Sequence, residues 1–224
     1  PNVPQFLVAM AAVVRAGYTV VNVNPLYTAR ELEHQLKDSG ASAIVILENF
    51  AHTLSEVIGH TQIKHTVLAS MGDLLGPFYG RWITFAVRHL AKMVPEFELP
   101  LGEQHKVTSF KDAVAAGRHL SFKPVTQSLD DIAFLQYTGG TTGLSKGAVL
   151  THRNIVAAIL QAETWFAPAL SRLPDLRKVN SIAALPLYHI FALTLCFLAM
   201  RQGSHLTLVP NPRDFAKFIE TLKT

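Results

Sequence analysis

Apolar positions in the first third of the chain alternate between the spacing of a helix and that of a buried strand. Residues 3–16 form a long apolar run that ends at Gly17, which predicts a buried helix with a glycine at its C-terminal end. Residues 18–23 are rich in β-branched side chains and predict a strand. The same alternation then predicts helices over residues 28–39 and 50–59 and strands over 43–47 and 65–69.

A capping box marks the start of the second helix. Thr28 is followed three residues later by Glu31, a spacing at which each side chain can bond the other's backbone N–H. Leu32 and Leu36 then lie one helical turn apart on the buried face, and Gly40 is placed to end the helix.

The pattern resumes in the last hundred residues. Here the apolar runs predict strands over residues 131–136, 148–150, 181–185 and 205–209, and helices over 151–166, from about 190 to 200, and 214–223, with a polar connection at 168–179. Helices that alternate with buried strands are typical of right-handed crossovers. The fold class predicted is therefore α/β, a mostly parallel β-sheet flanked by helices.

The middle of the chain breaks this alternation. Glycines and prolines punctuate residues 72–100, and between them residues 81–94 predict a helix. Residues 101–131 are more polar and predict loops, with one short helix over 109–115. We therefore expect an α/β unit at about 1–70, an irregular region at 72–123 and a second α/β unit at 124–224.

The stretch from residue 74 to 94 is basic and amphipathic. No acidic residue occurs between Leu74 and Pro95, whereas Arg81, Arg88 and Lys92 do. Phe78, Tyr79 and Phe85 add aromatic bulk near the start of the stretch. At helical spacing, one apolar face is formed by Trp82, Ile83, Ala86, Val87, Leu90, Met93 and Val94. Such a helix is typical either of a segment lying in a membrane interface or of an ordinary amphipathic helix packed on the protein.

A glycine-rich segment, residues 137–147, joins two of the predicted strands. It reads Tyr-Thr-Gly-Gly-Thr-Thr-Gly-Leu-Ser-Lys-Gly. Glycines let backbone N–H groups converge on an anion, and threonine hydroxyls and a lysine add donors suited to phosphate. Because Lys146 is followed by Gly147 and a strand rather than by a helix, the segment is not the phosphate loop of P-loop NTPases. It predicts a loop that holds a polyphosphate.

The order of residues in this segment closely resembles the signature of the adenylate-forming (AMP-binding) enzymes, usually written Tyr-Thr-Ser-Gly-Thr-Thr-Gly-x-Pro-Lys-Gly. Gly139 stands where serine is common, and Ser145 where proline is common. The resemblance implies that these residues hold the phosphates of ATP: Thr138, Gly139, Gly140, Thr141, Thr142, Gly143 and Lys146. It also implies a catalytic role for Lys146, which would neutralise charge on the departing pyrophosphate.

Further blocks resemble the acyl-CoA synthetases within this superfamily, and the bacterial long-chain fatty-acid–CoA ligases most of all. One runs from Arg15 to Ala41, and another begins at Thr151, where His152 and Asn154 are interpreted as structural. A third implies a catalytic His189 at the substrate carboxylate, against the alternative of an ordinary surface histidine, and acyl-site residues Tyr188, His189, Phe191, Ala192 and Thr194.

This resemblance implies ATP-dependent activation of a long-chain fatty acid through an acyl-adenylate to acyl-CoA, with ATP, Mg²⁺ and coenzyme A as cofactor and co-substrates. The family's magnesium-binding Tyr-Gly-x-Thr-Glu and ribose-binding Thr-Gly-Asp blocks do not occur. We therefore expect that the chain is a fragment of the large N-terminal domain and is catalytically incomplete by itself. We assign no metal ligands within it. The alternatives are a ligase for another carboxylic acid and a non-enzymatic nucleotide- or lipid-binding module.

The composition of the chain limits the classes of ligand and partner that we expect. Charged residues make up 16% of the 224, and the net charge is +4, which fits a polyanionic substrate. The chain contains no basic run of the kind that binds nucleic acid. A single cysteine, Cys196, excludes an internal disulfide framework. With no signal-peptide pattern, we expect a cytoplasmic protein, with peripheral membrane contact through residues 74–94 under the interfacial interpretation. The oligomeric state is not indicated.

Overall fold

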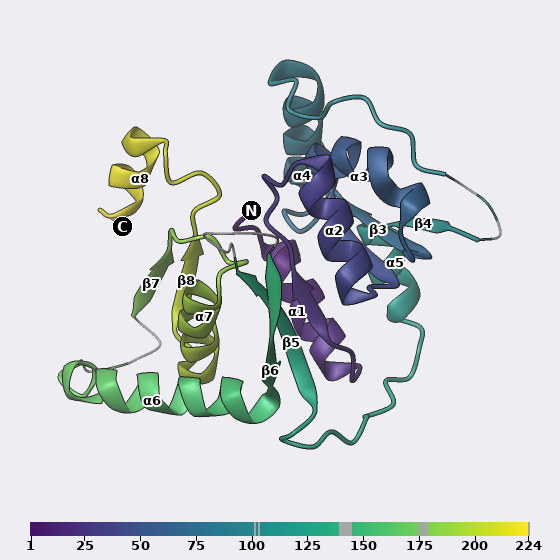
Figure 1. The fold of residues 1–224 in the computed structure, drawn as a ribbon. Helices are drawn as coiled ribbons and strands as arrows, with labels where there is room; N and C mark the ends of the chain where they lie inside the picture. The colour runs from purple at the N-terminus through teal and green to yellow at the C-terminus, as the bar shows by residue number, and fades with distance from the viewer. Residues whose placement is uncertain (101, 103, 139–144, 174, 176–178, 224) are drawn as a thin grey trace. The chain divides into compact units, whose positions relative to one another are not determined.

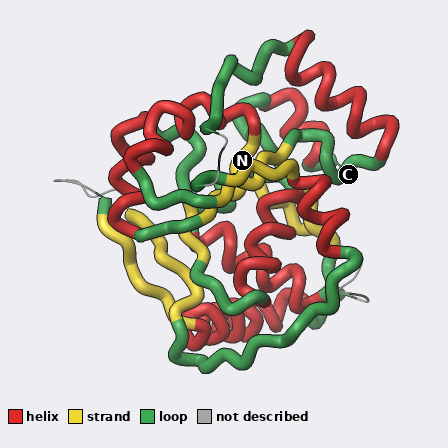
Figure 2. Tube along the Cα trace, turned by 90° about the vertical axis from the view of Figure 1, so that its right-hand side faces the viewer, coloured by secondary structure: helices red, strands yellow, loops and turns green. Residues whose placement is uncertain are grey.

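The computed structural model describes residues 1–100, 102, 104–138, 145–173, 175 and 179–223, and these form two units. Unit 1 combines Pro1–Asn22 with Val125–Thr224, and unit 2 is the intervening Val23–Pro124. Helices and strands alternate along both, as the ribbon and the tube show (Figures 1 and 2). In the described part of the chain every strand pair is parallel except β5 with β6, so the predicted α/β class is confirmed.

Unit 2 is built on a three-stranded parallel sheet in the order β2 (Ala43–Leu47), β3 (His65–Ala69) and β4 (Lys106–Ser109). The helical elements between and beside these strands are α2 (Ala29–Ser39), η1 (Glu48–Phe50), α3 (Ala51–Val57), η2 (Ile58–His60) and α5 (Phe110–Gly117). Leu32 and Leu36 of α2 pack with Leu54 and Val57 of α3 in one apolar core. The capping box of Thr28 and Glu31 is present, and Gly40 ends α2 in the left-handed conformation, both as predicted.

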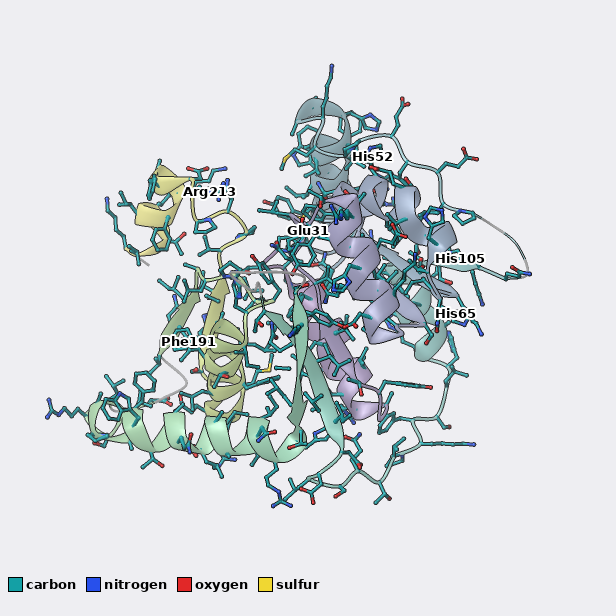
Figure 3. All side chains as sticks on the ribbon, viewed as in Figure 1. Glu31, His52, His65, His105, Phe191 and Arg213 are labelled. Atoms are coloured by element: carbon teal, nitrogen blue, oxygen red, sulfur yellow. The ribbon has the colours of Figure 1, made fainter. Side chains whose placement is uncertain are left out.

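The strand β4 was not predicted, because residues 101–131 look like loops from their polarity. Its Lys-Val-Thr-Ser sequence is too short and polar to show a strand pattern, and it is held by pairing with β3. His105, labelled in Figure 3, lies just before β4 and is buried. Its Nδ1 donates to Ile63 O at 3.1 Å, and its Nε2 lies 3.1 Å from Thr66 Oγ1. Tertiary hydrogen bonds therefore fix a segment whose local sequence is uninformative.

The helix expected over residues 81–94 begins and ends earlier than predicted. It consists of α4 (Pro77–Phe85) and one π-helical turn, η3 (Ala86–Leu90). Gly76 precedes it at φ 81°, and Pro77 takes the first helical position, where its missing N–H costs nothing. Lys92 has a φ of 50°, a conformation through which a right-handed helix cannot continue. The proline and glycines interpreted as loop punctuation are therefore the start of the helix.

Unit 1 holds two sheets. The first has the order β1 (Val20–Asn22), β5 (Ile132–Thr138) and β6 (Lys146–Thr151), and the second pairs β7 (Asn180–Ala183) with β8 (His205–Leu208). Its helices are α1 (Pro4–Arg15), α6 (His152–Leu170), α7 (Ile190–Gln202) and α8 (Phe215–Thr221), with α7 beside β7 and β8 in Figure 1. Met10 of α1, Phe134 of β5 and Leu193 of α7 meet in its core.

The helix α6 extends through Pro168, where a connection was expected. Proline removes one backbone donor and usually ends a helix. Here the last turn closes beyond it, because Ser171 N donates to Ala167 O at 2.8 Å and Ser171 Oγ donates to Pro168 O at 3.2 Å. None of the helices that the structure describes is long and apolar enough to span a bilayer.

Candidate active site

The glycine-rich segment lies between two strands that form an antiparallel pair, β5 and β6. Thr138 and Lys146 are Cα partners at the ends of these strands, and Tyr137 faces Gly147 one step further in. The sheet thus places a hydroxyl and an ammonium opposite each other, and both side chains are exposed. Gly139, Gly140, Thr141, Thr142 and Gly143 lie outside the described residues.

Gly147 is required by the packing of Tyr137. A Cβ added at Gly147 would lie 3.0 Å from one carbon of the Tyr137 ring and 3.1 Å from another. The ring is buried, at 7% exposure, and has little room to move aside. The last glycine of the signature therefore lets the Tyr137 ring lie close to β6, next to the pair formed by Thr138 and Lys146.

Hydrogen bonds hold the junction between β6 and α6, and Asn154 takes part in the helix cap. Thr151 caps α6: its Oγ1 accepts from Asn154 N at 3.3 Å, while Asn154 Oδ1 accepts from Thr151 N at 2.9 Å. Arg153 bonds Asp130 with distances of 2.9 and 3.1 Å. The guanidinium hydrogen bond, and then its charge, lower the pKa of Asp130. These contacts hold the start of α6 beside the segment that leads into β5.

Tyr188 and His189 occupy the turn between β7 and α7. Their ring centroids are 4.3 Å apart, with the planes tilted by 40°. His189 precedes the first residue of α7 but its side chain makes no capping bond there, and it is exposed. Its imidazole is therefore available to a ligand.

The turn is tied to β5 by a buried amide that sequence reasoning missed. Gln136 Nε2 donates to Tyr188 O at 2.9 Å, and Gln136 is 6% exposed. Gln136 stands two residues before Thr138 on the same strand. The structure thus links the Tyr188–His189 turn to the strand that carries Thr138. A glutamine within an otherwise apolar strand was the signal in the sequence.

An apolar cavity of about 320 Å³ lies in unit 1 where α6, α7, β7 and β8 meet. Its lining includes Phe166, Ala183, Ala192, Leu195, Cys196 and Leu206. Of the five residues assigned to the acyl site, Ala192 lines this cavity. Phe191, labelled in Figure 3, is 64% exposed, and Thr194 Oγ1 donates back to Ile190 O at 2.9 Å within the helix.

Cys196 is a packing residue of the cavity wall. It is fully buried, and burial raises the pKa of its thiol from 9.0 to about 11. A thiol with so high a pKa is almost wholly protonated near neutrality and is a poor nucleophile. The cavity therefore offers an apolar surface without reactive chemistry.

The described residues fit a polyanion better than they fit a metal ion. A threonine hydroxyl and a lysine ammonium are donors that phosphate oxygens accept. No group of three or more His, Cys, Asp or Glu side chains that could hold a metal ion occurs in the described ranges. The hairpin can thus contribute donors to a nucleotide's phosphates, and the nearby turn can contribute an imidazole.

Structures of known proteins share this fold. A long-chain-fatty-acid-CoA ligase from Archaeoglobus fulgidus superposes with a TM-score of 0.64 at 23% identity, over 100% of this chain and 37% of that one. An anthranilate CoA ligase in complex with anthranoyl-AMP superposes with a TM-score of 0.65 at 19% identity, over 92% of this chain and 33% of that one. At these identities the likeness establishes the fold alone.

Sequence relatives are closer. A long-chain-fatty-acid–CoA ligase from Yersinia pestis is 47% identical over 99% of this chain, and one from Haemophilus influenzae is 45% identical over 100% of it. The chain spans 38% and 39% of the lengths of these two relatives. Residues 1–224 match the protein family described as AMP-binding enzyme. The sequence signature, the α/β fold and this match over the whole chain agree: the chain belongs to the AMP-binding enzyme family.

Proposed function

We propose that the intact protein that contains this chain is a long-chain fatty-acid–CoA ligase. The observation that carries the proposal is the β5–β6 hairpin, which sets Thr138 opposite Lys146 in a chain 47% identical to a ligase of that name. In the proposed reaction the fatty carboxylate attacks the α-phosphate of Mg·ATP and releases pyrophosphate. The coenzyme A thiol then displaces AMP and forms the thioester.

Thr138, Lys146, His189 and Ala192 each have a distinct role in the proposed reaction. Thr138 and Lys146 hold the phosphates together with residues 139–143, and Lys146 neutralises the charge that develops on the departing pyrophosphate. His189, with Tyr188 beside it, borders the carboxylate. Ala192 and the apolar cavity along α7 favour a hydrocarbon chain as the rest of the acid. Magnesium ligands are assigned to other parts of the protein.

The test is pyrophosphate release by the intact protein with oleate, ATP and Mg²⁺. Lys146→Ala should slow adenylate formation about 100- to 1000-fold, by analogy with the loss of one oxyanion donor. Thioester formation from supplied acyl-adenylate should change less. Lys123→Ala, at an exposed lysine outside residues 137–147, is the control. Unchanged pyrophosphate release in Lys146→Ala would contradict the assignment.

The same assay separates the alternative functions. Turnover with aryl or short acids, but not with oleate, would identify a ligase for another acid. ATP binding without pyrophosphate release from any acid would identify a nucleotide-binding module.

We also propose that residues 74–94 bind an anionic membrane surface. The structure exposes Phe78 at 85%, Tyr79 at 61%, Trp82 at 56% and Phe85 at 48%. Trp82 and Phe85 lie one turn of helix apart, with ring centroids at 6.0 Å. Exposed aromatic side chains on a helix without acidic residues are typical of interfacial segments.

This aromatic face differs from the apolar face expected from the sequence. Ile83, Ala86 and Val87 are half-buried, so the expected face is divided between packing and exposure. Arg88 is not a free basic group, because its guanidinium bonds the buried carboxylate of Glu48. Arg81 and Lys92 are the exposed cations that fit anionic headgroups.

Binding of the intact protein to phosphatidylglycerol-containing liposomes should weaken with salt and with Arg81→Gln and Lys92→Gln, each cation contributing about 1 kcal/mol near the surface. Trp82→Ser should release the protein, whereas Trp165→Ser, at the chain's other and 82% exposed tryptophan, should not. Equal binding to neutral liposomes, equal effects of the two tryptophan variants, or no binding would favour a helix that packs on protein instead.

A further inference from the structure

The turn between β7 and α7, residues 184–189, has little local structure of its own. One backbone bond crosses it, from His189 N to Pro186 O at 3.0 Å, and Leu187 anchors it by burial at 1% exposure. Burial of one leucine fixes depth but not orientation, since apolar contacts are non-directional. The direction in which Tyr188 and His189 point must therefore be set by polar contacts.

One side of the turn is held by Asn2. Its Nδ2 donates to Ala183 O at 2.8 Å and to Leu185 O at 2.9 Å, and its Oδ1 accepts from Leu187 N at 3.0 Å. The amide is 3% exposed and uses both of its N–H groups. Only an amide offers two donors and an acceptor at this reach. An aspartate would lose both donors, and a leucine would lose all three bonds.

The other side is held by Gln136, whose Nε2 donates to Tyr188 O at 2.9 Å. The remaining amide oxygen of Gln136 accepts from Asn22 Nδ2 at 3.2 Å, and Asn22 is 4% exposed. Asn22 lies opposite Gln136 in the parallel pair of β1 and β5. The Asn22 bond fixes which end of the Gln136 amide faces Tyr188, so the three groups form a directional chain.

These amides are costly to bury. A buried polar group without a partner costs about 1–3 kcal/mol, and one with a partner contributes only about 1 kcal/mol net. An apolar side chain of similar size would fill the same space at no such risk. What the amides add is geometry, because each bond fixes a distance and a direction.

We propose that Asn2 and Gln136 are positioning residues that hold the Tyr188–His189 turn against the strand bearing Thr138, with Asn22 orienting Gln136. The inference rests on the proposed function, in which the turn borders the carboxylate and the hairpin holds the phosphates. A displacement of about 1 Å between such parts can lower a rate about 100-fold. The effect should fall on the rate of adenylate formation rather than on ATP affinity.

The intact protein tests this with Gln136→Met, which keeps the volume and removes the bonds. We expect kcat for pyrophosphate release to fall by about 10- to 100-fold, with the KM for ATP within about threefold of the parent. Gln127→Met is the matched control. Gln127 Nε2 also donates to a backbone carbonyl, but this is Val14 O in α1, at 2.7 Å, and not a carbonyl of the turn. Equal losses in the two variants would overturn the proposal.

A second variant gives a readout that a structural role would not produce. Gln136→Glu keeps the acceptor for Asn22 but cannot donate to Tyr188 O while it is ionised. Its activity relative to the parent should therefore rise as pH falls, because a protonated carboxyl can donate. Gln136→Met should show no such recovery. A flat pH ratio for Gln136→Glu would count against the Tyr188 bond.

Hydrogen exchange separates this proposal from the proposed function. Leu187 N donates to Asn2 Oδ1, so Asn2→Leu, which removes this acceptor, should speed exchange in peptides covering residues 184–190. Gln136→Met should do the same, and Gln127→Met should not. If the parent releases no pyrophosphate with any acid, the proposed function fails, yet exchange still decides whether the amides hold the turn. Unchanged exchange in the Asn2 and Gln136 variants would refute the inference.

Discussion

Replacing Gly80 of α4 by alanine should lower the free energy of unfolding, because the new Cβ would meet backbone atoms of another segment. A Cβ at Gly80 would lie 2.2 Å from Gly72 O, whereas ordinary contact begins near 3.4 Å. The obstacle is backbone, so α4 must move by about 1.2 Å relative to the Gly72 segment. Overpacking of this kind costs about 1–3 kcal/mol, and we take the upper end because no side chain can rotate away.

Helix propensity acts in the opposite direction. Alanine is better than glycine within a helix by about 1 kcal/mol, so the net destabilisation from Gly80→Ala should be about 2 kcal/mol. Gly117, in the last turn of α5, is the matched control, since a Cβ there would meet nothing within 4 Å. Gly117→Ala should be neutral or stabilising by up to about 1 kcal/mol. The two variants should thus differ by about 2–3 kcal/mol.

Hydrogen exchange in the intact protein measures both effects locally. Peptides covering residues 77–90 should exchange about 30-fold faster in Gly80→Ala, since about 1.4 kcal/mol corresponds to a factor of ten. Peptides covering residues 106–117 should exchange no faster in Gly117→Ala. Slower or unchanged exchange over α4 in Gly80→Ala would refute the close approach of the two backbones.

Three other predictions concern charge and the buried thiol. Arg88→Met leaves Glu48 buried without its partner and should lower the free energy of unfolding by about 2–3 kcal/mol, less than for a fully buried pair because Arg88 is half exposed. In denaturation measurements, adding Glu48→Gln should restore part of this loss, and additive losses in the double variant would contradict the pairing. Cys196, with its pKa raised from 9.0 to about 11, should be alkylated at pH 8 about 100-fold more slowly in the native than in the unfolded protein, and equal rates would exclude burial. Arg153 depresses the pKa of Asp130 below 3.8, so the contribution of this pair to stability is present above pH 3.8 and is lost as pH falls through the pKa that Asp130 has in the folded protein. Asp130→Asn should therefore make the free energy of unfolding less dependent on pH in this acid range, and an unchanged pH dependence would exclude the ion pair.

Local sequence signals predicted those elements whose stability is local. The ranges 43–47 and 65–69 of β2 and β3 were predicted as the structure has them, because each is an apolar run with a clear end on both sides. The capping box at Thr28 and the glycine at 40 were likewise legible, since their partners are close in sequence.

The elements that were missed depend on distant partners. Strand β4 exists through its pairing with β3, and α6 passes Pro168 because its last turn closes with bonds beyond the proline. At the candidate site, the signature located Thr138 and Lys146, and the structure shows them as strand partners. The amides of Asn2 and Gln136 could not be assigned, because the atoms they contact are 181 and 52 residues away. No periodicity encodes such a contact.

The division of unit 1 into two stretches of sequence has a consequence for how the chain is made. Strand β1 pairs with β5 through Val20 and Phe134, so about 110 residues must be synthesised after β1 before its partner exists. At about 5–20 residues per second this takes roughly 5–20 s. Closing an unstructured loop of that length costs about 4 kcal/mol of entropy, and prior folding of unit 2, which is continuous in sequence, shortens the open span.

During this interval the apolar side chains of nascent α1 have no core to pack against. Met10 of α1 packs with Phe134 and Leu193, so it can reach these core partners only after both have been synthesised. During that interval the apolar surface of α1 is available to other nascent chains. A substitution that slows folding of unit 2 would lengthen the wait, and the newly made protein would then aggregate through residues of unit 1 that the substitution never touched.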